Sequence, residues 1–434
     1  MDVKAAWLKE LEHPTEAFFE AFAARVQEDE GILAAACETV VCLVPRVDWA
    51  GYQPQVPHGL LGLWAVLRLR PLLTETSFLR ILATQLHAFA HEGRPAKGYR
   101  LPTFAQGSGH WGNLTLAIET HRPSLAWGEA VGMPQPVAED FARIATLVSG
   151  DMACVGHKAV MARCLGDLHG LLGDQLAGRR LLGIAAWLAA SEPADLFWHR
   201  RIRHRLGETP DGIAQADPRL DFQALEELAR LICEVGLVEL LDQLSARVRA
   251  GIGSGDLLAA FALAAAWKQL DARRDLEGKT AWIFVYLCQV EALSGPEGHP
   301  EPWLQAAALI NLFPSEEAVT RLKPKAPARP LAEPGTGLLE AILDGEAPEA
   351  MHYVSAMLEQ GGQGQTLKLL AEAAALNDPV FNHSHHILAV ASVAELLPRV
   401  PAQVGGTLLV ALAKMLANSQ GSCDLGRRAE AQFR

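Results

Sequence analysis

Positive charge is scarce in this sequence. Lys and Arg number 38 against 50 for Asp and Glu, which gives a formal net charge of -12. A chain of this charge has no global positive field that would attract a phosphate backbone or an anionic membrane. The single basic run, at 199–205, is interpreted as the solvated face of one helix. We therefore expect no nucleic-acid partner.

Long hydrophobic runs and paired cysteines are absent as well. The longest apolar run, at 257–267, is too short to cross a bilayer. Residues 1–20 carry acidic and basic side chains throughout, without the apolar core of a signal peptide. The seven cysteines are scattered and include no Cys-x-x-Cys, which is typical of reduced thiols. We therefore expect a cytoplasmic protein with no membrane span.

Several common catalytic motifs are also missing. The glycine-rich stretches at 251–256 and 361–365 lack the lysine of a phosphate-binding loop and follow helical patterns where strands would be required. No Gly-x-Ser-x-Gly motif and no zinc-type cysteine spacing occur. The sequence thus indicates neither a phosphate-binding loop nor a nucleophile elbow.

Helical patterns fill most of the chain. Half of the residues are hydrophobic but only 6% are aromatic, and apolar residues recur at helical spacing, as in 225–232. The strongest break, at 323–337, holds four prolines, which cannot continue a helix. We therefore predict a main helical body at 1–322, a Pro-rich linker at 323–337, and a C-terminal helical layer at 338–434 that closes the same site.

Four apolar segments align on one polar residue at the expected first position of a helix. These residues are His58, His157, Lys279 and His385. Each follows proline, glycine or serine, residue types that favour helix starts or precede them. Apolar residues occupy further matching positions in every segment, as one buried helix face requires.

A second apolar helix begins soon after each of these segments, near residues 77, 178, 302 and 405. Each unit then consists of a helix, a short turn and a returning helix. Pro71 and Pro398 occupy the same position in their segments, where a proline would end the first helix. We predict an all-α fold of repeated antiparallel helical hairpins packed around a central site.

Convergence of the four aligned residues would create a metal site. Neutral imidazole is a ligand for iron, zinc or copper. Lys279 is the exception, because an ammonium group beside Trp282 and Phe284 would lose hydration and would repel a cation. Lys279 fits a metal site in a modified form. A neutral lysine amine that reacts with carbon dioxide gives an anionic carbamate, and a carbamate binds metal as a carboxylate does.

The sequence resembles the questin oxidase-like family, all-helical enzymes some of which bind iron through four histidines and a carboxylated lysine. The resemblance lies in the helix that starts Pro57-His58-Gly-Leu-Leu, in Asn382-His383-Ser384-His385-His386, and in the His, His, Lys, His order. It implies oxidative cleavage or oxygenation of a bulky, apolar aromatic polyketide by iron(II) and dioxygen.

Four histidine ligands require one more than the aligned segments supply. His110, which opens an apolar helix after glycines, is the first choice. His87 and His91 are alternatives, because they share one helical face and an antiparallel hairpin returns that helix end towards His58. The predicted metal ligands are His58, His110, His157, Lys279 and His385, with His383 and His386 as alternates to His385.

Two other functions are compatible with the same residues. In a helical-repeat scaffold for protein interaction, the histidines only cap helices. A metal-dependent hydrolase needs carboxylates beside the metal, and Asp151 and Asp167 are the acidic residues near His157. Lys158 is interpreted as a solvated charge, and an unmodified Lys279 would be an exposed amine beside Glu277.

Overall fold

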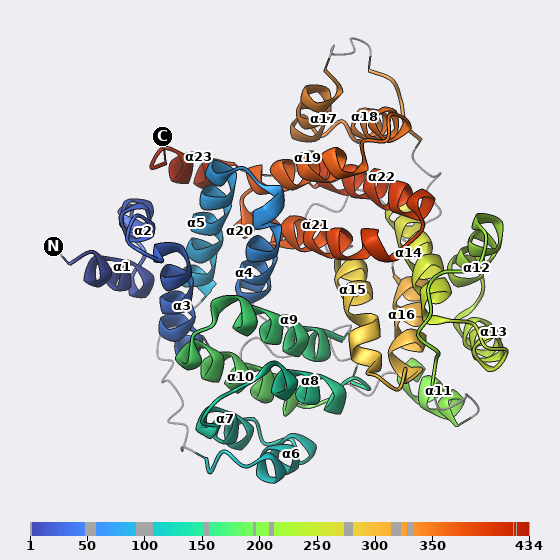
Figure 1. Ribbon diagram of the computed structural model, residues 1–434, viewed down its shortest axis with the longest axis horizontal. Coiled ribbons are helices and arrows are strands. Elements are labelled where there is room, and N and C mark those ends of the chain that lie inside the picture. The colour runs from blue at the N-terminus through green and yellow to red at the C-terminus, as the bar shows by residue number, and fades with distance from the viewer. Residues whose placement is uncertain are drawn as a thin grey trace. The chain divides into compact units, whose positions relative to one another are not determined.

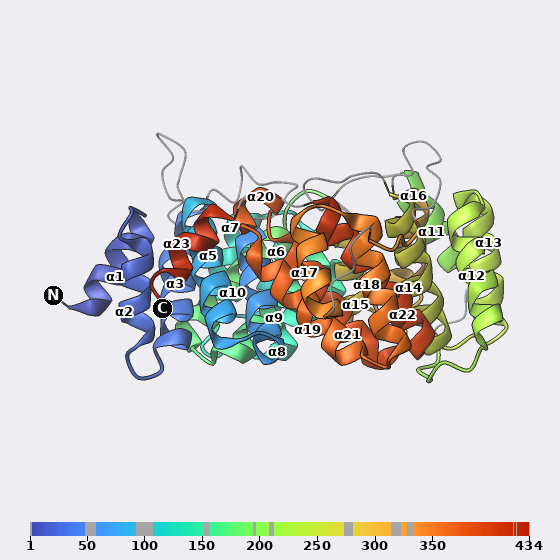
Figure 2. The same ribbon diagram turned by 90° about the horizontal axis from the view of Figure 1, so that it is seen from above.

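The computed structural model consists of helices and connecting turns (Figure 1). It describes residues 2–47, 58–92, 107–151, 156–193, 197–207, 212–272, 281–313, 323–327, 333–419, 421 and 423–433. Every regular element in these ranges is a helix, and none is a strand (Figure 2). The predicted all-α fold class is therefore confirmed.

The chain divides into two compact units, which are described separately. The first comprises Met1–Leu67, Leu79–Asp195 and Asp424–Arg434. Its helices are α1 (Val3–Glu12), α2 (Phe18–Val26), α3 (Gly31–Leu43), η1 (Val44–Arg46), α4 (His58–Leu69), α5 (Glu75–Glu92), α6 (Trp111–Glu119), α7 (Pro123–Gly132), α8 (Ala138–Leu147), α9 (His157–Leu172), α10 (Gln175–Ala189) and α23 (Asp424–Glu430). Within this unit α10 packs against α3, α7, α8 and α9, and nearly all of its residues are buried.

The second unit comprises Arg68–Phe78, which joins α4 to α5, and Leu196–Cys423. Its helices are η2 (Arg70–Leu72), α11 (Phe197–Leu206), α12 (Phe222–Glu234), α13 (Leu237–Arg249), α14 (Ser254–Asp271), α15 (Trp282–Ser294), α16 (Glu301–Leu312), α17 (Pro334–Leu343), α18 (Ala347–Glu359), α19 (Gln363–Leu376), α20 (Pro379–Asn382), α21 (His385–Leu396), η5 (Leu397–Arg399) and α22 (Ala402–Asn418). Its central helix, α14, packs against α12, α15, α16 and α22.

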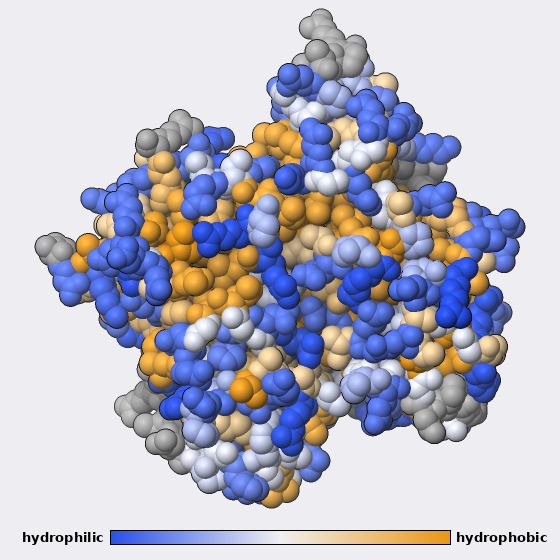
Figure 3. Space-filling model, in the orientation of Figure 1, coloured by the Kyte–Doolittle hydropathy of each residue, from blue (hydrophilic) through white to orange (hydrophobic). Residues whose placement is uncertain are grey.

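The position of a helix within its unit follows from its apolar pattern. α14 is buried almost all round, as a helix that is apolar on every side requires. α12 instead buries one stripe that includes Leu225, Leu228 and Ile232. Figure 3 shows mostly hydrophilic residues over α12 and α13.

The helix starts predicted from the aligned segments are confirmed at three of four positions. His58, His157 and His385 are the first residues of α4, α9 and α21. Pro71 and Pro398 lie in the 3₁₀ turns η2 and η5, which follow the first helices as predicted. Lys279 lies outside the described residues.

The Pro-rich segment contains the start of a helix. Pro334 is the first residue of α17, where a proline is tolerated because the N–H that it lacks has no partner within the helix. The predicted linker is not the boundary between the two compact units. Residues 338–423 belong to the second unit, and residues 424–434 belong to the first. The role predicted for 338–434, closing a site shared with the main body, stays a prediction.

Two smaller expectations concern the membrane and the cysteines. In the described ranges, no helix has both the length and the apolar character that a membrane crossing needs. The six cysteines within those ranges are free thiols, and Cys154 lies outside them. Burial raises the pKa of Cys37 and of Cys288 to about 11, so both thiols stay protonated near neutral pH.

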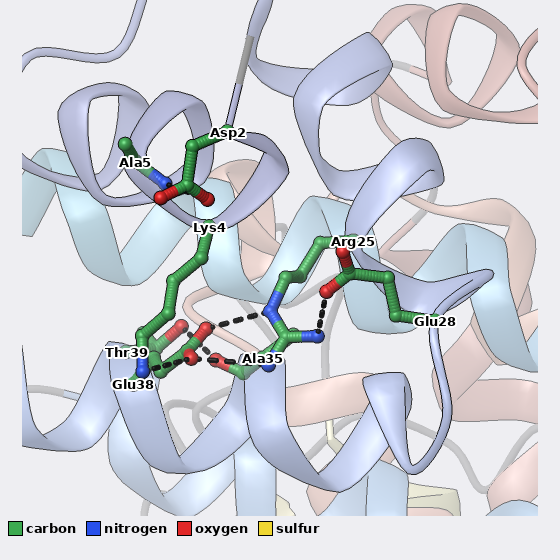
Figure 4. A network of polar contacts seen from close by, with 8 residues as sticks. All are labelled: Asp2, Lys4, Ala5, Arg25, Glu28, Ala35, Glu38 and Thr39. Atoms are coloured by element: carbon green, nitrogen blue, oxygen red, sulfur yellow. Dashed lines mark hydrogen bonds and ion pairs between the residues drawn. The ribbon is translucent and has the colours of Figure 1, made fainter.

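A partly buried ionic network joins the first three helices (Figure 4). The guanidinium of Arg25 on α2 is bound at both ends by Glu38 on α3, with Nε–Oε2 and Nη2–Oε1 distances of 3.0 Å. Its Nη1 donates to Glu28 at 2.7 Å, and Lys4 on α1 lies 3.3 Å from Glu38. The hydrogen bond with Glu38 is the main cause of a raised Arg25 pKa. Two-point contact of this kind is stronger than a single ion pair.

We expect Arg25→Ala to lower the free energy of unfolding by about 2 to 3 kcal/mol, because it removes the two-point contact and leaves the Glu38 carboxylate with the exposed Lys4 as its remaining partner. Arg25→Lys should lower it less, since the charge remains while the two-point contact is lost. Urea denaturation measures both. Arg427→Ala is the control, because Arg427 pairs with Asp424 between exposed side chains. Equal effects at the two sites would contradict the role given to Arg25.

Candidate functional site

Two of the predicted ligands come together in the first unit. His58 starts α4 and His157 starts α9, and their imidazole rings lie 5.7 Å apart between centroids at an angle of 83°. Gly156, at φ 81°, turns the chain directly into α9, a conformation that glycine adopts without strain. Both imidazoles are half-buried. The pair joins segments remote in sequence.

The separation of these rings suits ligands of one metal ion. Two imidazoles with metal–nitrogen bonds of about 2.1 Å have ring centroids about 5 to 5.6 Å apart at coordination angles of about 100° to 120°. The observed 5.7 Å is close to the upper value, so a small movement of either ring would suffice. Neutral imidazoles suit iron, zinc or copper.

Lys158, the neighbour of His157, is a buried cation. Only 6% of its side chain is exposed, and its Nζ lies 2.5 Å from Asp151 Oδ2. The same Nζ donates to the carbonyl oxygens of Ser191 at 2.7 Å and Glu192 at 3.2 Å, just beyond α10. The interpretation of Lys158 as a solvated charge is therefore wrong, because carbonyl groups at this helix end and one carboxylate take the place of water.

The two acidic residues named for a hydrolase differ in their surroundings. Asp151 forms an ion pair with Lys158. Asp167 lies on α9 itself, about 15 Å farther along the helix axis than His157. The metal-dependent hydrolase stays a prediction.

No complete metal site is present among the described residues. In these ranges, no three His, Cys, Asp or Glu side chains gather in a metal-binding arrangement. Lys279 lies outside them, so its predicted carbamate stays a prediction. Among the described residues, the pair of imidazoles is the part of the predicted ligand set that comes together, and the full set of five stays a prediction.

His110 caps a helix. It precedes α6, and its Nδ1 accepts a hydrogen bond from the backbone N–H of Gly112 at 3.1 Å. Its own backbone N–H donates to Glu129 at 3.2 Å. This is the role that the scaffold hypothesis gives to such histidines. The ligand role of His110 stays a prediction.

His386 is committed to a buried hydrogen-bond network in the second unit. Its Nδ1 accepts from Asn377 Nδ2 at 3.2 Å, because an amide nitrogen only donates. Its Nε2 therefore donates to Ser419 Oγ at 2.6 Å, and that hydroxyl donates to the Met415 carbonyl at 2.6 Å. Burial, followed by the nearby His385, lowers the pKa of His386 to about 3. With both ring nitrogens engaged, His386 does not suit a metal.

Of the other two histidines in this segment, His385 keeps the predicted position. It is buried at the first position of α21. His383 is exposed and has a left-handed backbone at φ 48°, and the two rings lie 6.3 Å apart between centroids. His385 thus keeps its place as the predicted ligand, and His383 stays an alternate to it.

Sequence reasoning missed a second buried lysine. Lys414 on α22 donates to the carbonyl oxygens of Gln269 at 2.6 Å and Ala272 at 2.5 Å, at the end of α14. Burial lowers its pKa to about 8, with a smaller opposing effect from Asp271. A single lysine within the apolar run Leu412-Ala-Lys414-Met-Leu416 was the signal that would have found it.

No family model, curated protein or solved structure matches this chain. The resemblance to the questin oxidase-like proteins therefore stays a prediction. What the chain does has to be inferred from its own residues.

We expect Ser419→Ala to lower the free energy of unfolding by about 1 to 3 kcal/mol, because it removes the acceptor of the buried His386 Nε2–H. Ser355→Ala is the matched control, since Ser355 makes the same hydrogen bond to the carbonyl four residues before it. Urea denaturation followed by circular dichroism compares them. A loss at Ser419 no greater than at Ser355 would contradict the assigned network.

Proposed function

We propose that the chain is a metal-dependent oxygenase, with iron(II) as the metal and dioxygen as co-substrate. The observation that carries the proposal is the approach of His58 and His157, two helix-start imidazoles within 5.7 Å. The substrate would be a bulky, apolar aromatic or polyketide-like small molecule. Iron and this substrate class come from the resemblance to questin oxidase-like proteins.

His58 and His157, both in the first unit, would hold the ion. His385, and Lys279 as its carbamate, stay further ligands predicted from the sequence alone. The fourth histidine ligand would be His110, His87 or His91. The bound ion would supply a place for dioxygen to bind and be activated. The chain's own contribution is positional, because α4 and α9 fix the two imidazoles at their first turns.

The surroundings of the pair support its use as a rigid ligand set. Leu60 and Leu61 follow His58 in the buried part of α4, and Val160 and Met161 do the same in α9. Buried packing of the first turns holds both rings in place, which metal ligands require.

The scaffold function is the second candidate, and one observation favours it. His110 caps α6 through its ring nitrogen. The scaffold hypothesis assigns this capping role to all of the helix-start histidines. A scaffold needs only stacked helices and would leave the metal content at zero. The metal content of the purified protein therefore separates the two functions.

We expect anaerobically purified protein to take up about one equivalent of iron(II), because His58 and His157 already lie close together in the folded chain. His58→Ala and His157→Ala should each weaken iron binding by at least about tenfold, since each removes a direct ligand. Equilibrium dialysis with elemental analysis measures both.

His204→Ala is the control for these variants, because His204 is exposed on α11. Circular dichroism shows whether each variant is folded. Iron uptake below about a tenth of an equivalent by the wild-type protein would contradict the oxygenase and favour the scaffold. Unchanged iron binding in both folded histidine variants would show that this pair is not the site.

A further inference from the structure

A second pair of histidines lies on α5. His87 and His91 are about one helical turn apart on the same face, and their Nε2 atoms are 3.2 Å apart. Their ring centroids are 4.4 Å apart, with the ring planes at 60°. The nitrogen distance alone fits either a shared proton or a shared metal ion.

The ring centroids exclude a straight hydrogen bond. In a straight N–H···N hydrogen bond of this length, both centroids lie on the line of the nitrogen atoms, about 5.5 Å apart. Two imidazoles that bind one ion with nitrogen bonds of about 2.1 Å, at an angle near 100°, have centroids about 5 Å apart. The observed 4.4 Å is shorter than both values, so the rings are tilted away from a straight N–H···N line. The 3.2 Å between the Nε2 atoms equals the separation of about 3.2 Å that two nitrogen ligands of one ion have at this angle, and a change in ring tilt would direct both nitrogens at the ion.

One ligand of the pair is fixed and the other is accessible. His87 is 8% exposed and packs on Phe18, at 5.0 Å between centroids and 81°, and on Phe19, at 5.2 Å and 26°. His91 is exposed to solvent. An ion can thus reach the pair from water, and the aromatic contacts hold the first imidazole in position.

We propose that His87 and His91 form a two-histidine chelate for a divalent transition metal ion, separate from the His58–His157 pair and completed by water. Zinc, nickel and copper suit such neutral imidazoles, with copper bound most tightly. In the described ranges no third His, Cys, Asp or Glu joins either pair to make a larger cluster. The two pairs are thus distinct sites on neighbouring helices, where Gln85 of α5 donates to the Gly59 carbonyl of α4 at 3.1 Å.

Occupation of this chelate would also stabilise the fold. An ion that binds only the folded chain raises the thermal midpoint, and the stabilisation grows with the logarithm of the ratio of its concentration to its dissociation constant. Because the ring of His87 stacks on Phe19, the same ion would hold α2 against α5. The N-terminal helices would therefore be the part of the first unit that gains most protection from hydrogen exchange.

The test uses zinc chloride as the probe and the full chain with His58→Ala and His157→Ala as the background, so that zinc at that pair does not interfere. We expect this protein to bind about one equivalent of zinc. Adding His91→Ala should weaken zinc binding about a hundredfold, because the second imidazole no longer binds within the same molecule. It should also abolish the zinc-dependent rise in thermal midpoint. Equilibrium dialysis and thermal unfolding give the two readouts.

His204→Ala in the same background is the control and should leave zinc binding unchanged. Equal zinc affinity with and without His91→Ala would overturn the proposal. If the protein with both His58→Ala and His157→Ala fails to fold, the wild-type protein is compared with the single variant His91→Ala. The same number of bound zinc ions in these two proteins would overturn the proposal. Loss of iron(II) from the otherwise wild-type His91→Ala protein would also overturn it, because both pairs would then serve one ion. Failure of iron binding at His58 and His157 leaves the chelate intact.

Discussion

Carbonyl groups at the ends of buried helices have to find hydrogen-bond donors inside the protein, because an α-helix leaves its last carbonyls without partners. The donors here are polar side chains from other helices. Lys158 binds carbonyls beyond α10, and Lys414 binds those at the end of α14. Asn311 Nδ2 does the same for α12, donating to the carbonyls of Ile232 at 2.8 Å and Val235 at 2.9 Å. The packing of these helices depends on such contacts.

This constraint changes how polar residues near helix ends should be interpreted. A buried lysine or histidine in an all-helical protein serves the backbone first, as His386 does through Ser419 and Met415. A functional role is therefore assigned only to a side chain whose position is not explained by hydrogen bonds to the backbone. His58 and His157 meet that condition through their approach to each other, and His87 and His91 through Nε2 atoms that lie 3.2 Å apart. His110 caps α6 through one ring nitrogen.

The two histidine pairs differ in what holds them. His58 and His157 come from helices far apart in the sequence, so their separation depends on how α4 and α9 pack. His87 and His91 lie on one helix, and their spacing depends on the helix repeat alone. The first pair would therefore respond to any change in packing of the unit, whereas the second would persist wherever α5 is folded.

The sequence by itself determined the fold class and the first residues of α4, α9 and α21. Both follow from local rules, because helical periodicity and the residue before a helix act over a few positions. Pro71 and Pro398 were informative for the same reason. The predicted linker at 323–337 overlaps a helix, because Pro334 is the first residue of α17. A proline can start a helix as well as end one.

Only the tertiary structure decided which polar side chains are buried and what they touch. Lys158 was interpreted as solvated because nothing near it in the sequence reveals the carbonyls of Ser191 and Glu192. The sequence pattern does not distinguish His385 from His386. In the structure, Asn377 and Ser419 form hydrogen bonds with His386. Hydrogen-bond partners come from distant segments, and their geometry depends on packing distances that no local pattern encodes.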